Sequence, residues 1–190
     1  MSPDVVPLSA DELLDALDDL AELLIDTVLG GASIGFLAPL DPATAAAWWR
    51  ERIPAVRAGR LSVRVARDGG RITGTVGVVF ADKPNARHRA DIVKLMVHRD
   101  ARGKGLGRAL LSAGERAAAE SGVTLLLLDT ETGSPAETLY HSAGWTAIGV
   151  VPGHAADPAG TLRPTTFFYK ELSAAPANGT EERQVAPGLL

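Results

Sequence analysis

Helical patterning dominates the N-terminal part of the chain. A capping-box pair, Ser9 and Glu12, precedes apolar residues that recur every three or four positions as far as Val28. This pattern predicts an amphipathic helix that ends at the glycine pair immediately after it. A second helix is expected between Pro42 and Gly59, because an Asp-Pro pair supplies its N-cap and first-turn proline.

The next residues show the alternation and turn signals of β-strands. Two predicted strands, 61–66 and 72–80, flank an Asp-Gly-Gly turn and form a hairpin. Farther on, apolar stretches alternate with helical patterns, which favours a mixed sheet with helices on both faces. The other predicted strands are 91–98, 124–129, 145–151 and 165–171, and the other predicted helices begin near Leu106 and Pro135.

Composition limits the classes of protein that fit. The chain has 190 residues, a formal charge of −4 and no cysteine. We therefore expect one domain over 1–172, without disulfides, thiolate metal sites or a cysteine nucleophile. The negative charge argues against nucleic acid or an anionic membrane as a partner. Residues 173–190 are rich in Ala, Pro, Gly and charges, which predicts a disordered tail.

Location and metal binding are also constrained. No apolar run approaches the ~20 residues of a membrane span, and residues 1–9 lack the basic region of a signal peptide. The protein is therefore predicted to be cytoplasmic.

His98 and His154 have no partner at metal-ligand spacing, so we expect structural or solvent-exposed histidines and no metal site.

The glycine-rich segment 102–108 is the first candidate for chemistry. It follows an apolar strand and opens a helix, where free backbone N–H groups can bind an anion. Glycines at 103, 105 and 107 would let a phosphate approach closely. The spacing matches neither a dinucleotide-binding fingerprint nor a P-loop. Taken alone, the segment could equally be a tight turn that binds nothing.

Two motifs together resemble those of the GNAT superfamily of N-acetyltransferases. Arg102-x-x-Gly105-x-Gly107 is similar to the family's acetyl-CoA pyrophosphate motif, and Leu-Tyr-His-Ser-Ala-Gly-Trp at 139–145 is similar to its second signature. The apolar strand 125–128 lies between them, as in the family. The resemblance implies an α/β (α+β) fold with a mixed, mostly antiparallel sheet of about 6–7 strands. Helices would cover both faces, and splayed strands would bind acetyl-CoA.

A closer likeness is to tabtoxin-resistance-type acetyltransferases, bacterial enzymes that protect against a β-lactam-containing dipeptide toxin. The similar segments are 91–97, 128–134, 151–153, 160–165 and 167–170. This resemblance implies a bacterial source and a role in toxin or antibiotic resistance. The chain departs from the superfamily pattern at Gly133, where an asparagine usually contacts the pantetheine arm. Ser134 beside it is a candidate either for contact with the cofactor or for the helix cap.

The superfamily resemblance also implies which residues hold acetyl-CoA. The backbone of Leu95, Met96 and Val97 would pair with the pantetheine amides like an added strand, and the Val97 N–H would stabilise the oxyanion. The pyrophosphate would lie against the amides of Arg102, Gly103, Lys104, Gly105, Leu106, Gly107 and Arg108.

Three residues are candidates for catalysis by direct attack of an amine on the thioester. Tyr140 stands where the family places the proton donor to the departing sulfur, and a phenol stays protonated at neutral pH. Asp91 and Asp129 are candidate bases, because they lie at ends of the two strands expected around the cofactor. Alternatively, Tyr140 only anchors its helix, and the aspartates cap turns. Trp48 and Trp49 cannot share a helix face, so one is expected in the core and the other is a candidate for the substrate pocket.

These observations predict an acetyl-CoA-dependent N-acetyltransferase acting on the primary amine of a small molecule, such as a toxin, an antibiotic or an amino-acid-like compound. Paired acids suit a cationic amine electrostatically. One alternative is a protein or peptide N-terminal acetyltransferase. Another is a non-catalytic CoA-binding module, which the presence of Tyr140 and both aspartates disfavours. A homodimer is a further candidate, since relatives are often dimers.

Overall fold

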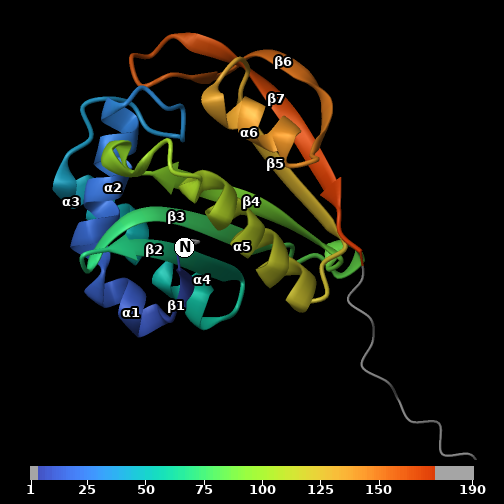
Figure 1. Cartoon of the computed structure of the whole chain (residues 1–190), viewed down its shortest axis with the longest axis horizontal. Helices are drawn as coiled ribbons and strands as arrows, with labels where there is room; N and C mark the ends of the chain where they lie inside the picture. Colours follow the sequence, from blue (N-terminus) through green and yellow to red (C-terminus); the bar gives the residue numbers. More distant parts are fainter. Residues whose placement is uncertain (1–3, 174–190) are drawn as a thin grey trace, which may run out of the picture.

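A seven-stranded sheet in the order β1-β2-β3-β4-β5-β7-β6 forms the centre of the molecule (Figure 1). This computed structural model describes residues 4–173. β4 and β5 are parallel, and every other neighbouring pair is antiparallel. The predicted mixed, mostly antiparallel α/β fold with helices on both faces is confirmed. The predicted tail, 173–190, lies outside the described residues apart from Ser173.

Strands and helices follow one another along the chain in an order close to the predicted one. They are β1 (Val5–Leu8), α1 (Ala10–Asp15), α2 (Leu17–Leu29), α3 (Pro42–Arg50), α4 (Ile53–Arg57), β2 (Leu61–Asp68), β3 (Arg71–Phe80), β4 (Arg89–Val97), α5 (Leu106–Glu120), β5 (Leu125–Glu131), α6 (Pro135–Ser142), β6 (Thr146–Ala156) and β7 (Leu162–Glu171). Two short 3₁₀ helices, η1 (Pro84–Ala86) and η2 (Arg99–Ala101), precede and follow β4.

The helices before β2 differ from the prediction. The capping box of Ser9 and Glu12 is present, but the helix that it opens ends at Asp15, with Ala16 as its C-cap, and α2 begins separately at Leu17. The break lets α1 pack against α4 while α2 packs against α3. The second predicted helix is also divided, because Pro54 has no N–H to continue the hydrogen bonding and lies instead in the first turn of α4. β1 is not predicted by the sequence pattern at all.

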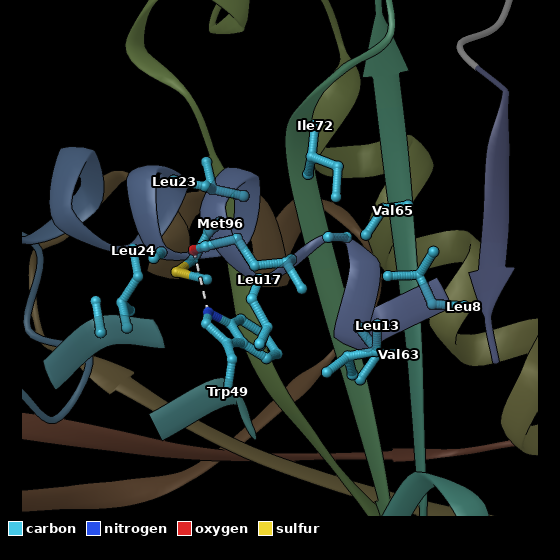
Figure 2. Close-up of a cluster of buried hydrophobic side chains, with 14 of the residues drawn as sticks. Leu8, Leu13, Leu17, Leu23, Leu24, Trp49, Val63, Val65, Ile72 and Met96 are labelled. Carbon is cyan, nitrogen blue, oxygen red and sulfur yellow. Dashed lines mark hydrogen bonds between the residues drawn. The ribbon is translucent and has the colours of Figure 1, made fainter. Parts of the chain in front are cut away.

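Two buried clusters fill the space on the two faces of the sheet. Under α1–α4, leucines of the helices meet Val63, Val65 and Ile72 of the sheet, as Figure 2 shows. Trp49 closes this cluster, and its indole Nε1 donates a hydrogen bond to the Leu20 carbonyl at 3.0 Å. The other cluster lies under α5 and α6. Trp49 is therefore the core tryptophan of the adjacent pair.

The separation of β4 from β5 is the feature that positions the candidate site. The two strands pair only between 89–91 and 125–127 and then diverge (Figure 1). Each strand continues for several residues beyond the last pair. The central sheet therefore opens in the middle, at the place where the sequence motifs converge. Among residues 4–173, no helix is both long and apolar enough to cross a membrane.

Candidate active site

The glycine-rich segment presents open backbone at the start of α5. Gly103 and Gly105 have φ values of 75° and 77°, and a Cβ on either would meet no protein atom within 4 Å. Gly105 is the N-cap of α5 and provides no side-chain hydrogen bond, so no capping side chain occupies the first-turn N–H groups. These donors stand at the positive end of a 15-residue helix. The segment therefore fits a pyrophosphate group.

Three basic side chains surround this open backbone. The Arg102 Nε donates to the Val97 carbonyl at 3.0 Å, and the Lys104 Nζ donates to a carbonyl of η2 at 3.2 Å. The Arg108 guanidinium donates to the Ser142 hydroxyl and connects α5 with α6. All three basic residues are exposed, so they add positive charge where an anion would lie.

Other residues of the predicted cofactor site turn their side chains into the protein. Met96 and Leu106 are buried in the two clusters, which leaves only their backbone for a ligand. A Cβ at Gly107 would contact Leu139 at 3.4 Å, so this third glycine faces α6 rather than open space. Ser134 is the N-cap of α6, accepting a hydrogen bond from the Glu137 N–H at 3.2 Å.

A buried aspartate holds the segment before the glycines. Asp26 of α2 accepts hydrogen bonds from the Arg99 backbone N–H, at 3.0 Å, and from the Arg99 Nε. Although burial opposes ionisation, these bonds and the nearby charge of His98 hold the pKa of Asp26 below its ordinary value. His98 is buried beside it, with its Nε2 3.6 Å from the carboxylate. His98 thus has the surroundings of a structural histidine.

The β4 backbone faces the opening in the sheet. The His98 N–H donates to the Thr73 carbonyl on β3 at 2.8 Å. Because successive N–H groups of a strand point to opposite sides, the Val97 N–H points away from β3 and toward the gap. β5 offers no partner to this edge of β4 after Asp91. The edge can therefore pair with the amides of an extended ligand, as the sequence predicts for the pantetheine arm.

Tyr140 lies in α6 within the cluster under α5 and α6. Its side chain is 6% exposed, and its ring centroid is 5.9 Å from that of Phe168 and 6.1 Å from that of Trp145. Burial raises the pKa of the Tyr140 phenol well above its ordinary value, and the charge of Asp129 adds to the shift. The hydroxyl therefore keeps its proton at neutral pH and can act as a hydrogen-bond or proton donor.

The two predicted carboxylates line one cleft of about 390 Å³. Their neighbours in sequence (Ala90, Ile92 and Leu128) belong to the cluster under α5 and α6. Strand alternation therefore directs Asp91 and Asp129 to the opposite face. Burial raises the pKa of Asp91; the charge of Arg89 opposes this shift, and the charge of Asp129 adds to it. A larger hollow of about 640 Å³ near α1 and α4 contains no predicted site residue.

The loop 30–41, between α2 and α3, bounds the carboxylate side of the opening. Its Ile34 carbonyl accepts a hydrogen bond from the Lys94 ammonium of β4 at 2.7 Å. Its Ala38 N–H donates to the Pro158 carbonyl between β6 and β7 at 2.8 Å. The loop therefore bridges β4 and the β6–β7 hairpin, which lie on opposite sides of the gap in Figure 1.

Sequence reasoning missed the cationic part of this region. Trp48, the second tryptophan of the pair, is half-buried and lies against Phe36 of the loop, with ring centroids 5.6 Å apart. The charged ends of Lys94 and Arg52 lie over the Trp48 ring. A signal was available, because Lys94 is the single charge in the apolar strand segment Ile-Val-Lys-Leu-Met-Val.

Comparisons with known proteins agree with this geometry. The profile of the acetyltransferase (GNAT) family matches residues 20–145, and the chain belongs to this family. The rat protein N-acetyltransferase 8 is 36% identical over 87 residues, which are 45% of this chain and 39% of that protein. The chain thus matches less than half the length of this curated relative.

Solved structures share the fold across nearly the whole chain. A phosphinothricin acetyltransferase from Sinorhizobium meliloti, solved with acetyl-CoA, superposes with a TM-score of 0.76 and 21% identity, covering 96% of this chain and 95% of that one. A ribosomal-protein-alanine N-acetyltransferase from Brucella melitensis has a TM-score of 0.71 and 24% identity, with coverages of 89% and 99%. These structures confirm the predicted GNAT fold, and the profile match confirms membership of the acetyltransferase family.

Proposed function

We propose that this protein transfers the acetyl group of acetyl-CoA to the primary amine of a small molecule, by direct attack in a ternary complex. The single observation that carries the proposal is the pair Asp91 and Asp129, which line one cleft beside the opening between β4 and β5. Carboxylates in this position attract an ammonium group and can take its proton. The resemblance to tabtoxin-resistance-type enzymes supports a bacterial cytoplasmic protein that inactivates a toxin, an antibiotic or an amino-acid-like compound.

Each part of the site has a distinct task in this proposal. Acetyl-CoA, when bound, supplies the acetyl thioester. The open backbone of 102–108 holds the pyrophosphate, and the edge of Leu95–Val97 that β5 leaves unpaired holds the pantetheine arm, with the Val97 N–H directed to the developing oxyanion. Asp91 or Asp129 accepts the proton that the amine loses as its nitrogen bonds to the acetyl carbon. Tyr140 donates a proton to the sulfur as the carbon–sulfur bond breaks.

The bridging loop favours a small acceptor over an extended peptide. The Ser33 hydroxyl donates to the Ala156 carbonyl at 3.0 Å, which adds a second tie between loop 30–41 and the end of β6. A chain running across the acceptor side would have to pass this closed boundary. A protein or peptide N-terminal acetyltransferase is therefore the weaker candidate, although one similar structure is that of a ribosomal-protein-alanine N-acetyltransferase.

The test is thiol release from acetyl-CoA with amino acids, dipeptides, polyamines, aminoglycosides and N-terminal peptides. Turnover with one small-molecule class supports the proposal when Asp129→Ala and Tyr140→Phe each lower kcat at least about tenfold. Asp68→Asn, at the exposed turn between β2 and β3, is the matched control. Turnover of peptides alone would favour the alternative. Calorimetric binding of acetyl-CoA without any turnover would indicate a CoA-binding module instead.

A further inference from the structure

Lys94 adopts a backbone conformation that lysine rarely takes. β4 bulges at this point, so that Lys94 and Leu95 together lie opposite Val76 of β3. The φ of Lys94 is 49°, the only positive φ at a non-glycine residue in the described range 4–173. Glycine would take this conformation without a steric cost. A side chain kept at such a position is a candidate for a function of its own.

The ammonium group of Lys94 lies in an aromatic environment. It is 5.1 Å from the Trp48 ring centroid and 5.6 Å from that of Phe36. One of its protons is donated to the Ile34 carbonyl, which leaves two for other acceptors. No carboxylate between residues 4 and 173 forms an ion pair with it. Burial lowers the pKa of Lys94 and the charge of Arg52 lowers it further, whereas the more distant charge of Asp129 opposes the shift.

Arg52 brings a second cation to the same indole. Its Cζ lies 3.9 Å from the Trp48 ring centroid, and its NH1 donates to the Trp48 carbonyl at 3.0 Å. Its ion-pair partner, Glu51, is exposed, with an oxygen 2.9 Å from that same NH1. Two cations therefore flank one aromatic ring, and in the described residues their only ion pair is the one between Arg52 and the exposed Glu51. An added anion would relieve their mutual repulsion.

We propose that Lys94 and Arg52 bind the carboxylate of the acceptor, so that the substrate is a zwitterion, an amino acid or a short peptide with a free amine. This inference rests on the proposed function. Asp91 precedes Lys94 by three residues, a separation of about 10 Å along a strand. Regular alternation would place the two on opposite faces, but the bulge turns Lys94 to the face of Asp91, where it contacts Trp48. Their separation is roughly the span of a small zwitterion with a hydrogen bond at each end. The acids would hold the ammonium and the cations the carboxylate.

The test compares each acceptor with its own amide. Steady-state kinetics are measured with L-leucine, L-glutamine and L-alanyl-L-alanine and with their C-terminal amides, for the wild type and Lys94→Met. In the variant we expect the ratio of kcat/KM for acid over amide to fall about 10- to 100-fold, mainly through KM for the acid. Comparing ratios removes the difference in amine basicity. Lys94→Arg should retain most of the preference, and exposed Lys83→Met should leave it unchanged.

Other outcomes separate this inference from the proposed function. An unchanged ratio in Lys94→Met, or a parallel loss with acids and amides, would overturn the inference and leave a structural role for Lys94. If no amine releases thiol even with the wild type, the proposed function fails. In that case, L-leucine and L-leucinamide are titrated calorimetrically into the CoA-saturated protein. The inference requires that L-leucine binds and that Lys94→Met weakens the binding of L-leucine more than that of L-leucinamide. If L-leucine does not bind in this way, the inference is wrong.

Discussion

Replacement of Asp26 by asparagine should weaken the fold at the base of the glycine-rich segment. The substitution keeps the shape of the side chain but removes the charge that accepts two hydrogen bonds from Arg99. Hydrogen bonds to a charged group exceed neutral ones by about 1 kcal/mol each. The Arg99 side chain is 53% exposed, so solvent screens part of that advantage. We expect a loss of about 1.5–2 kcal/mol at pH 7 and a decrease in Tm of roughly 3–8 °C.

The pH dependence gives this prediction its sharpest form. The folded pKa of Asp26 is lowered, so its ionisation stabilises the fold above the unfolded pKa of about 4, and this contribution is lost as the pH falls below that value. Urea unfolding of wild type and Asp26→Asn at pH 7 and pH 3 should show a gap that narrows in acid. Asp68→Asn controls for loss of an exposed charge. Equal stabilities at pH 7, or a gap independent of pH, would refute the reasoning.

Three further predictions concern single residues of the site and core. Asp91→Asn should lower kcat/KM by about 10²-fold. Because burial raises the pKa of Asp91, the acid limb of the wild-type pH profile of kcat/KM should lie above the pKa of an ordinary aspartate. An acid limb at the pKa of an ordinary aspartate would exclude Asp91 as the base. Gly105→Ala and Gly122→Ala, both at positive φ, should each cost about 1–2 kcal/mol by urea unfolding, but only Gly105→Ala should weaken calorimetric binding of acetyl-CoA. A Cβ at Gly74 would lie 2.7 Å from Leu110, so Gly74→Ala should destabilise by about 1–3 kcal/mol, whereas Gly149→Ala, with open space around it, should change stability little.

The parts of the fold that the sequence predicts are those with strong local signals. The Asp-Gly-Gly turn specifies the β2–β3 hairpin, and the capping box specifies the start of α1, because both depend on nearby residues only. The sequence pattern does not predict β1, because its four residues form a strand only by pairing with β2, which is distant in sequence. The division of the first helix at Ala16 is likewise set by packing of α1 and α2 on different helices.

The residues of the candidate site also differ in how far the sequence predicts them. The cofactor segment and Tyr140 belong to contiguous motifs, so their positions follow from a resemblance. The cationic group of Lys94 and Arg52 does not, because it forms where a strand bulge, a helix end and loop 30–41 meet. Gly107 belongs to the motif, but it lets α5 pack closely against Leu139 of α6 and does not face the space where a ligand would lie.

The divergence of β4 from β5 has a consequence for the order of events. The glycine-rich segment opens on the face of α5, whereas the aspartates lie on the face of α2 and α3. The two groups thus lie on opposite faces of the sheet, beside the place where β4 and β5 stop pairing. In the proposed reaction, acetyl-CoA therefore approaches from the face of α5 and the amine from the face of α2 and α3. Neither substrate obstructs the other's entry, and each product can depart by the route along which its precursor arrived.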